Sequence, residues 1–324
     1  EGDATAIVEF IEYWLRKYGR MNSPLFLLGE SYGTIRNLAI ADLLPDSTKL
    51  GGIVSIGTSF NVGSPTTMLI EPNVRRLGAN AACNWYHNHR EEKPLTTFIK
   101  EAIDFAYSEY AHALLMGNRL PEDEFEATLE KLHYYTGLSK DVLRAGKLRF
   151  DEMTFLMYLL PGRLVSAYDS RISRPLAHKM SQEEWEEAFE TEPFFNFANG
   201  KIEEGMDRYL DEELARPENR HIDLSEMIQI AMRWDYSLPS KDTLELPVEL
   251  MERKPKMRIM FVAGYYDLQS TFDFVTYYMG RYDLPEERIT FNIYESGHAS
   301  YIGGNSANEV CEDIRKFIAS AAVE

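Results

Sequence analysis

The stretch PLFLLGESYG, residues 24–33, decides the fold. Its first part, Pro24 to Gly29, is a short continuous apolar run, which is typical of a parallel strand that is buried on both faces. From Gly33 to about Leu44 the apolar residues follow a helical spacing, and a proline then ends the pattern. A strand, a sharp turn and a helix therefore follow one another directly.

The turn between this strand and this helix matches the pattern G-x-S-x-G around Ser31. A serine at such a turn has a strained backbone, and its neighbours two positions away must be small for the chain to pass. We therefore expect Gly29 and Gly33 to be required for steric reasons. The helix N-terminus would lie beneath the serine, where the amide of Tyr32 can donate a hydrogen bond to an oxyanion. The pattern predicts that Ser31 is a nucleophile.

Both ends of the chain alternate strands and helices in the same way. Three further buried strands are expected, at residues 52–56, 257–262 and 289–294. Amphipathic helices are expected at residues 4–18, with Asp3 as N-cap, 270–280 and 305–322. This alternation indicates a parallel sheet, whereas the middle of the chain is rich in Glu, Tyr, Met and Leu at helical spacing. We therefore predict an α/β core from residues 1–59 and 251–324, and a helical cap from residues 60–250.

A serine nucleophile needs a base, and the base needs an acid that orients it. Asp267 stands just past the third expected strand, and His298 stands just past the fourth. These positions predict that His298 is the base and Asp267 the acid. Asp273 is an alternative acid, although it lies inside the following helix, and Glu295 is a weaker alternative.

The other histidines and the cysteines give no second site. His87 and His89 form an H-x-H pair, but no nearby carboxylate or cysteine cluster completes a metal site. Surface or polar core positions are expected for the remaining histidines, His112, His133, His178 and His221. Cys83 and Cys311 are too few for a disulfide framework, although one structural pair stays open. We expect neither a metal nor an organic cofactor.

The acidic composition narrows the class of partner. The 324 residues hold 34 Lys and Arg against 52 Asp and Glu, a formal net charge of −18. A protein that binds nucleic acids or anionic membranes needs basic surface patches, so this acidic chain is a poor candidate for either. In addition, no apolar run approaches the roughly 18 residues of a membrane helix. Residues 181–220 hold 13 acidic and 4 basic side chains, so half of the net charge falls in the cap. We interpret this segment as a solvated helical surface, with a role in substrate choice as the alternative.

Three motifs together resemble those of the serine carboxypeptidases, a family of α/β-hydrolases, in a bacterial-type branch. They are GESYG at residues 29–33, GYYD at 264–267 and SGH at 296–298. The long insertion before the third strand supports the resemblance, because that family carries its helical cap there. The resemblance implies that the serine, aspartate and histidine of these motifs form a triad, and that Glu30 binds the free C-terminal carboxylate of a peptide. Two carboxyls share a hydrogen bond only when one is protonated, so such recognition works best at acid pH.

The same resemblance makes the visible strands numbers 5 to 8 of an eight-stranded sheet, with the cap between strands 6 and 7. Strands 1 to 4 and the family's glycine-rich oxyanion loop have no counterpart in the sequence. We therefore expect this chain to be the C-terminal part of a longer enzyme, with an unpaired apolar edge at the strand of residues 24–29. Losing one oxyanion donor costs about 2.7–4 kcal/mol of transition-state stabilisation, so we expect little or no activity from the chain alone.

The expected activity is the release of C-terminal residues from peptides through an acyl-enzyme on Ser31. One alternative is a proline-type aminopeptidase or an esterase of the same fold, and an alternative of another class is a non-catalytic binding protein on a hydrolase scaffold. The expected partners are a peptide substrate and the missing N-terminal segment. The resemblance somewhat favours a secreted or periplasmic protein, although the sequence shows no signal peptide.

Overall fold

The computed structural model of the chain describes residues 2–60, 72–176, 180, 192–214, 226, 229–230, 233, 243–302, 304 and 306–322. The core elements are α1 (Gly2–Lys17), β1 (Leu25–Glu30), α2 (Tyr32–Leu43), β2 (Leu50–Ile56), α13 (Leu246–Arg253), β5 (Arg258–Gly264), α14 (Phe272–Arg281), a 3₁₀ turn (Glu286–Arg288), β6 (Ile289–Tyr294) and α15 (Ser306–Ala322). Between β2 and α13 lie α3 (Pro72–Arg75), α4 (Leu77–Asn84), a π-turn (Trp85–His89), α5 (Leu95–Phe105), a π-turn (Ala106–Tyr110), α6 (Ala111–Met116), a 3₁₀ turn (Gly117–Arg119), α7 (Glu122–Thr136), α8 (Lys140–Ala145), α9 (Glu152–Tyr158), β3 (Arg163–Val165), β4 (Ser173–Pro175) and α11 (Pro193–Glu212).

The core is built on a four-stranded parallel sheet in the order β1-β2-β5-β6. Glu30 pairs with Ile56, Ile56 with Val262, and Gly264 with Tyr294, so all four strands end on the same side of the sheet. The prediction of four adjacent parallel strands is confirmed. Because the strands end together, the segments that follow them meet at that side, and these segments carry the candidate residues.

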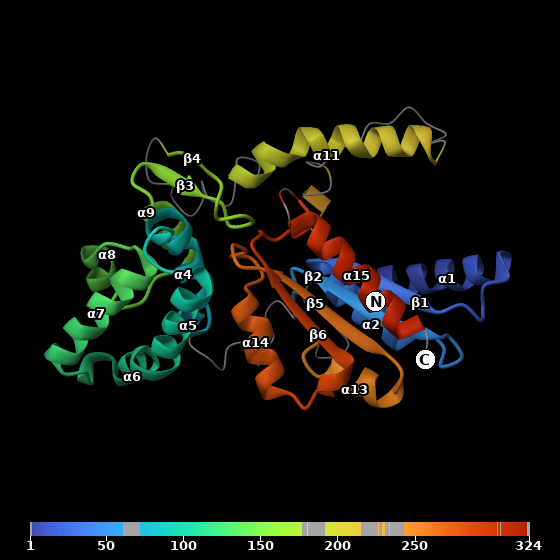
Figure 1. The fold of residues 1–324 in the computed structure, drawn as a ribbon, viewed down its shortest axis with the longest axis horizontal. Coiled ribbons are helices and arrows are strands. Elements are labelled where there is room, and N and C mark those ends of the chain that lie inside the picture. Colours follow the sequence, from blue (N-terminus) through green and yellow to red (C-terminus); the bar gives the residue numbers. More distant parts are fainter. Residues whose placement is uncertain are drawn as a thin grey trace.

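Helices cover both faces of the sheet (Figure 1). On one face the strands pack against α15, through residues such as Val54, Val262 and Phe317. On the other face they pack against α2, α13 and α14, through residues such as Ile53 and Leu250. Neighbouring residues of β2 alternate between the two faces, and full burial of each large aliphatic side chain stabilises the fold by about 1.5–3 kcal/mol. The predicted α/β class is confirmed, with the sheet as the middle layer.

β1 and β6 are the two edge strands of the described sheet, and β1 has only β2 beside it. Leu28 is 58% exposed, so the prediction of a strand buried on both faces is wrong for β1. The prediction of a buried strand is also wrong for β6, in which residues 289–293 are only partly buried. α1 packs on α2 next to this edge, yet most of its apolar face is also open, and Phe10 is 60% exposed. The helix begins at Gly2, so Asp3 lies in its first turn rather than at the N-cap, and it accepts a hydrogen bond from the Tyr32 hydroxyl at 3.0 Å.

The cap is mainly helical, as predicted, and it also holds a hairpin that was not predicted. α4, α5, α7 and their neighbours pack around one hydrophobic cluster that includes Leu77, Phe98 and Leu132. β3 and β4 pair antiparallel, but strands of three residues are too short to give a strand pattern in the sequence. Figure 1 shows the cap beside the core. The same hydrophobic cluster includes Tyr266 and Phe272 of the core, so cap and core share buried contacts.

Several predictions concern residues outside the described part of the chain. Much of the acidic segment lies there, at residues 181–191 and 215–220, as do His178 and His221. The interpretation of the acidic segment therefore stays a prediction. Among the described helices, none is both long and apolar enough to cross a membrane.

Candidate active site

Ser31 occupies the sharp turn between β1 and α2. Its backbone has φ 52° and ψ −120°, a combination that residues with a side chain rarely adopt, and α2 begins at the next residue, Tyr32. A Cβ at Gly29 would lie 2.5 Å from the carbonyl oxygen of Gly33, so glycine is required at Gly29. A Cβ at Gly33 would meet no atom of the described structure within 4 Å, so the expected steric need for glycine there is absent. Ser31 thus sits at the carboxyl end of the sheet, in front of the positive end of α2.

Asp267 and His298 are brought together from the loops that follow β5 and β6. His298 Nδ1 lies 2.9 Å from Asp267 Oδ2, and the two residues are only 3% and 0% exposed. The other carboxylate oxygen, Oδ1, accepts hydrogen bonds from the amides of Gln269 and Ser270 at 2.8 and 2.9 Å. These bonds fix the carboxylate, and the carboxylate in turn fixes the orientation of the imidazole.

The two alternative acids have other partners. Asp273 Oδ2 accepts a hydrogen bond from the amide of Ala79 in the cap at 2.7 Å, and burial raises the pKa of this carboxyl to about 7. Glu295 is exposed, and its carboxylate accepts a hydrogen bond from the hydroxyl of Tyr266 at 3.4 Å. Of the three carboxylates, Asp267 is therefore the one hydrogen-bonded to His298.

The surroundings of His298 suit a base. Burial lowers the pKa of His298, but the charge and hydrogen bond of Asp267, with the charge of Glu30, outweigh burial and leave this pKa above its usual value. The second ring nitrogen, Nε2, is buried and has no hydrogen-bond partner in the described structure. Leaving a buried polar atom unpaired costs about 1–3 kcal/mol, so such atoms are rare and call for an explanation. An imidazole held in this way can accept a proton at Nε2.

Gly57, directly after β2, lies next to both Ser31 and His298. The amide of Ser31 donates to the carbonyl of Ile56 at 3.0 Å, and Gly57 follows with a φ of 53°. A Cβ at Gly57 would lie 2.7 Å from both Cε1 and Nδ1 of His298. The imidazole therefore packs directly against this glycine. No motif marks Gly57 in the sequence, and its one signal is a glycine at the end of a buried strand.

Replacing Gly57 with alanine is expected to disable the site. The new methyl group would overlap the imidazole, and a side chain at positive φ costs about 1–2 kcal/mol. We expect His298 to shift, and the rate at which a fluorophosphonate labels Ser31 to fall by about 100-fold. Gly117→Ala is the matched control, because Gly117 has a φ of 54° but no atom within 4 Å of its Cβ position. Equal labelling rates in the two variants would contradict the packing role of Gly57.

A chain of hydrogen bonds links the serine turn to the loop of the acid. The Thr34 hydroxyl donates to the carbonyl of Ser31 at 2.7 Å and accepts from the amide of Ser59 at 3.0 Å. The hydroxyl of Ser59 lies 3.2 Å from that of Ser270, whose amide bonds Asp267. The turn of Ser31 and the loop of Asp267 are thereby connected by hydrogen bonds.

Comparison with known proteins adds no relative. No family model matches the chain, and no curated protein or solved structure is significantly similar to it.

Glu30 directly precedes Ser31 and is paired with a residue that the sequence analysis did not single out. Its Oε2 accepts a short hydrogen bond from the hydroxyl of Tyr301, which lies three residues after His298. Burial, together with the charge of Glu30, raises the pKa of Tyr301, so the phenol stays protonated and remains a donor. In the described structure the other oxygen, Oε1, accepts no hydrogen bond. Glu30 therefore has one carboxylate oxygen held by Tyr301 and one without a described hydrogen bond.

The remaining candidate groups make local contacts. His87 Nε2 lies 2.7 Å from the carbonyl of Ser170, and burial lowers the pKa of His87. His89 Nδ1 lies 2.8 Å from the carboxylate of Glu92. Both cysteines are free, so the structural pair does not form. Burial raises the pKa of the Cys83 thiol to about 12. Within the described ranges, no group of three or more potential ligands could hold a metal ion.

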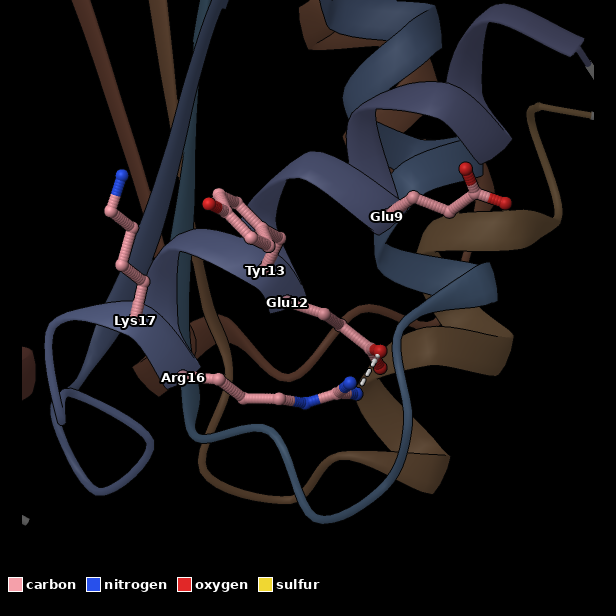
Figure 2. Close-up of a pocket in the computed structure, with 5 residues that line it drawn as sticks. All are labelled: Glu9, Glu12, Tyr13, Arg16 and Lys17. Atoms are coloured by element: carbon pink, nitrogen blue, oxygen red, sulfur yellow. Dashed lines mark hydrogen bonds and ion pairs between the residues drawn. The ribbon is translucent and has the colours of Figure 1, made fainter.

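Among the described residues, two hollows lie away from His298. One, of about 540 Å³, lies on the surface of α1. Figure 2 shows the side chains around it, where Glu12 pairs with Arg16. It is lined by Glu9, Glu12, Tyr13, Arg16 and Lys17, none of which belongs to the site. A second, of about 300 Å³, lies where the cap meets the residue after Asp267. It is lined by Pro72, Asn73, Arg76, Asn80, Phe150, Asp151, Glu152, Phe155 and Leu268.

Proposed function

We propose that the chain is the catalytic part of a serine hydrolase with an α/β-hydrolase core. The observation that carries the proposal is His298, which is buried, bonded through Nδ1 to Asp267 and unpartnered at Nε2 in the described structure. Its ring packs against Gly57, and the residue before Gly57, Ile56, bonds the amide of the strained Ser31. The four parallel strands would be strands 5 to 8 of that fold, with the cap inserted between strands 6 and 7. The order of serine, acid and histidine along the chain agrees with such a core.

The proposed reaction is acyl transfer. Ser31 Oγ attacks the carbonyl carbon of the scissile bond while His298 Nε2 takes the hydroxyl proton, and Asp267 stabilises the imidazolium that forms. The amide of Tyr32, at the start of α2, donates to the oxyanion of the tetrahedral intermediate. His298 then gives its proton to the leaving amine as the C–N bond breaks, which leaves an acyl-enzyme on Ser31. Water hydrolyses that ester with His298 again as the base.

Glu30 and Tyr301 favour a carboxypeptidase within this class. A carboxylate beside the nucleophile with one oxygen left for a ligand can share a proton with the terminal carboxylate of a peptide. Tyr301 holds the other oxygen, so the carboxylate cannot rotate freely. The proposed substrate is therefore a peptide with a free C-terminus, and the product is its last residue.

Pairs of blocked peptides test this activity. A carboxypeptidase is expected to cleave a peptide with an acetylated N-terminus and to leave the same peptide uncut when its C-terminus is amidated. The opposite result would identify an aminopeptidase. Cleavage of simple esters without either peptide would identify an esterase.

Replacing Glu30 with glutamine is expected to change how KM depends on pH. With Glu30 present, loss of the shared proton leaves two carboxylates facing each other, so KM for free-carboxylate peptides should rise by up to about tenfold per pH unit. Glutamine has the same shape and donates an N–H at every pH, so KM should become nearly independent of pH. Tyr301→Phe keeps Glu30 and should keep the wild-type slope, which makes it the control. A wild-type KM that does not change with pH would contradict the shared proton.

The open edge of β1 belongs to the same proposal. Leu28 and several apolar residues of α1 are exposed, and β1 has an unpaired edge in the described structure. These features suit a further strand-bearing segment of the enzyme. A loop from that segment would supply the second oxyanion donor. All rates in the experiments are therefore compared with the wild-type chain.

A further inference from the structure

One short segment of the cap lies against the loop that carries the acid. This bridging segment, residues 167–171, follows β3. The carbonyl of Ala167 accepts a hydrogen bond from the amide of Leu268 at 2.9 Å, and the amide of Ser170 donates to the carbonyl of Tyr266 at 2.9 Å. The bridging segment is therefore bonded to the loop on both sides of Asp267.

The bridging segment also bonds the base itself. The carbonyl of Tyr168 accepts a hydrogen bond from the amide of His298 at 2.7 Å, and the Tyr168 ring stands edge-on to the imidazole at 5.3 Å. The contact is so close that a Cβ at Gly297 would lie 2.5 Å from the carbonyl oxygen of Tyr168. The position of His298 thus depends on where the bridging segment lies.

Arg171 joins the three parts with a single side chain. Its Nε and Nη2 donate to the two carboxylate oxygens of Asp169 at 2.8 and 2.6 Å, within the bridging segment. Its Nη1 donates to the carbonyl of Glu295 at 2.8 Å, on the loop of the base. The guanidinium also lies 5.1 Å from the centre of the Tyr266 ring, on the loop of the acid. The three nitrogens donate in different, fixed directions, because the guanidinium group is planar. The single ammonium group of a lysine cannot reproduce this arrangement.

The cap holds the bridging segment at its other end. The buried carboxylate of Glu192 caps α11 by accepting from the amides of Phe194 and Phe195, and it also accepts from the amide of Ala167 at 3.0 Å. Burial raises the pKa of Glu192, and the hydroxyl of Ser166 bonds the same carboxylate. The bridging segment is therefore anchored in the cap. Its described hydrogen bonds to the core all go to two loops, the loop of Asp267 and the loop of His298.

We propose that Arg171 is a positioning residue, which acts from the cap to hold the loop of His298 and the loop of Asp267 in one arrangement. The role rests on the proposed hydrolase function, because it concerns the geometry of that triad. A shift of about 1 Å in a catalytic group can cost about 100-fold in rate, so a residue that touches no substrate can control the reaction. The cap is then part of the machinery that aligns the triad, in addition to covering the site.

The test compares four proteins: the wild type, Arg171→Met, Arg171→Lys and Arg163→Met. Arg163 is the matched control, because it is an exposed arginine of β3 that bonds Ser173. The rate constant for labelling of Ser31 by a fluorophosphonate is measured between pH 5 and 9, and the imidazole of His298 is titrated by NMR. We expect the labelling rate to fall about 10- to 100-fold in Arg171→Met, to fall less in Arg171→Lys, and to stay unchanged in Arg163→Met.

The pH dependence separates positioning from stability. A weaker contact with Asp267 leaves burial to lower the pKa of His298, so the NMR midpoint and the labelling midpoint of Arg171→Met should both move to lower pH. An unchanged rate constant and an unchanged midpoint in folded Arg171→Met would overturn the proposal, even if less of the protein folds. If the wild type is folded but not labelled, the proposed function fails, whereas the NMR midpoint still decides whether Arg171 positions His298.

Discussion

Ser31→Ala is expected to end covalent labelling by a fluorophosphonate and to abolish whatever peptide hydrolysis the wild-type chain shows. The hydroxyl is the atom that forms the acyl bond, so nothing else in the triad can replace it. The fold should be retained, because alanine also has a Cβ and the backbone strain at φ 52° is the same. Intact-mass spectrometry measures labelling, and circular dichroism checks the fold.

Ser23→Ala is the matched control for Ser31→Ala. Ser23 lies in the turn before β1, and in the described structure its hydroxyl makes no hydrogen bond, so its removal should change neither labelling nor hydrolysis. Peptide mapping of the labelled wild type should place the adduct on the segment that contains Ser31. An adduct that persists in Ser31→Ala would refute the assignment, and a folded wild type without any adduct would favour a binding protein over an enzyme.

The sheet could be predicted from the sequence because its information is local. Each strand is a short stretch rich in apolar and β-branched residues, and the last of the four predicted stretches falls at the very residues of β6, Ile289–Tyr294. The exposure of Leu28 could not be predicted in the same way, because an edge strand has the same apolar pattern as a central one. The β3–β4 hairpin was missed because its strands hold three residues each.

In the candidate site, too, the residues marked by a local pattern could be predicted, and those defined by distant contacts could not. The serine turn follows from a local pattern, and Asp267 and His298 follow from their places after strands. Gly57 was missed because its need for glycine comes from His298, which lies far away in the sequence. The contact between Tyr168 and His298 was missed for another reason: it is made by a backbone carbonyl, which every residue type possesses. Sequence patterns thus singled out the candidate reactive groups but not the residues that contact them.

Asp267→Asn is expected to lower kcat by about 10⁴-fold with little change in structure. The amides of Gln269 and Ser270 donate to Oδ1 of Asp267, so an asparagine must place its oxygen there and turn its NH₂ group toward His298. Nδ1 of the imidazole then has to accept that hydrogen bond, which puts the ring proton on Nε2. An imidazole in this tautomer cannot take the proton of Ser31.

The same substitution should change the titration of His298. Asp267 is the main reason that the pKa of His298 stands above its usual value, so without this charge burial dominates and the pKa falls. In the wild type the base must lose its proton to act, so kcat should rise with pH through a midpoint above the usual histidine value, whereas the variant should show a lower NMR midpoint. Measuring kcat against pH and titrating the imidazole by NMR gives both values.

Asp273→Asn distinguishes the acid of the triad from a buried carboxylate that only supports the fold. Asp273 is 4% exposed and bonds the amide of Ala79, so its loss should affect the contact between α14 and the cap and leave kcat within about tenfold of the wild type. If Asp273→Asn loses activity as strongly as expected for Asp267→Asn, while Asp267→Asn stays active, the roles assigned to the two carboxylates are reversed. Because Asp267 alone of the two is hydrogen-bonded to His298, we expect the 10⁴-fold loss only at Asp267.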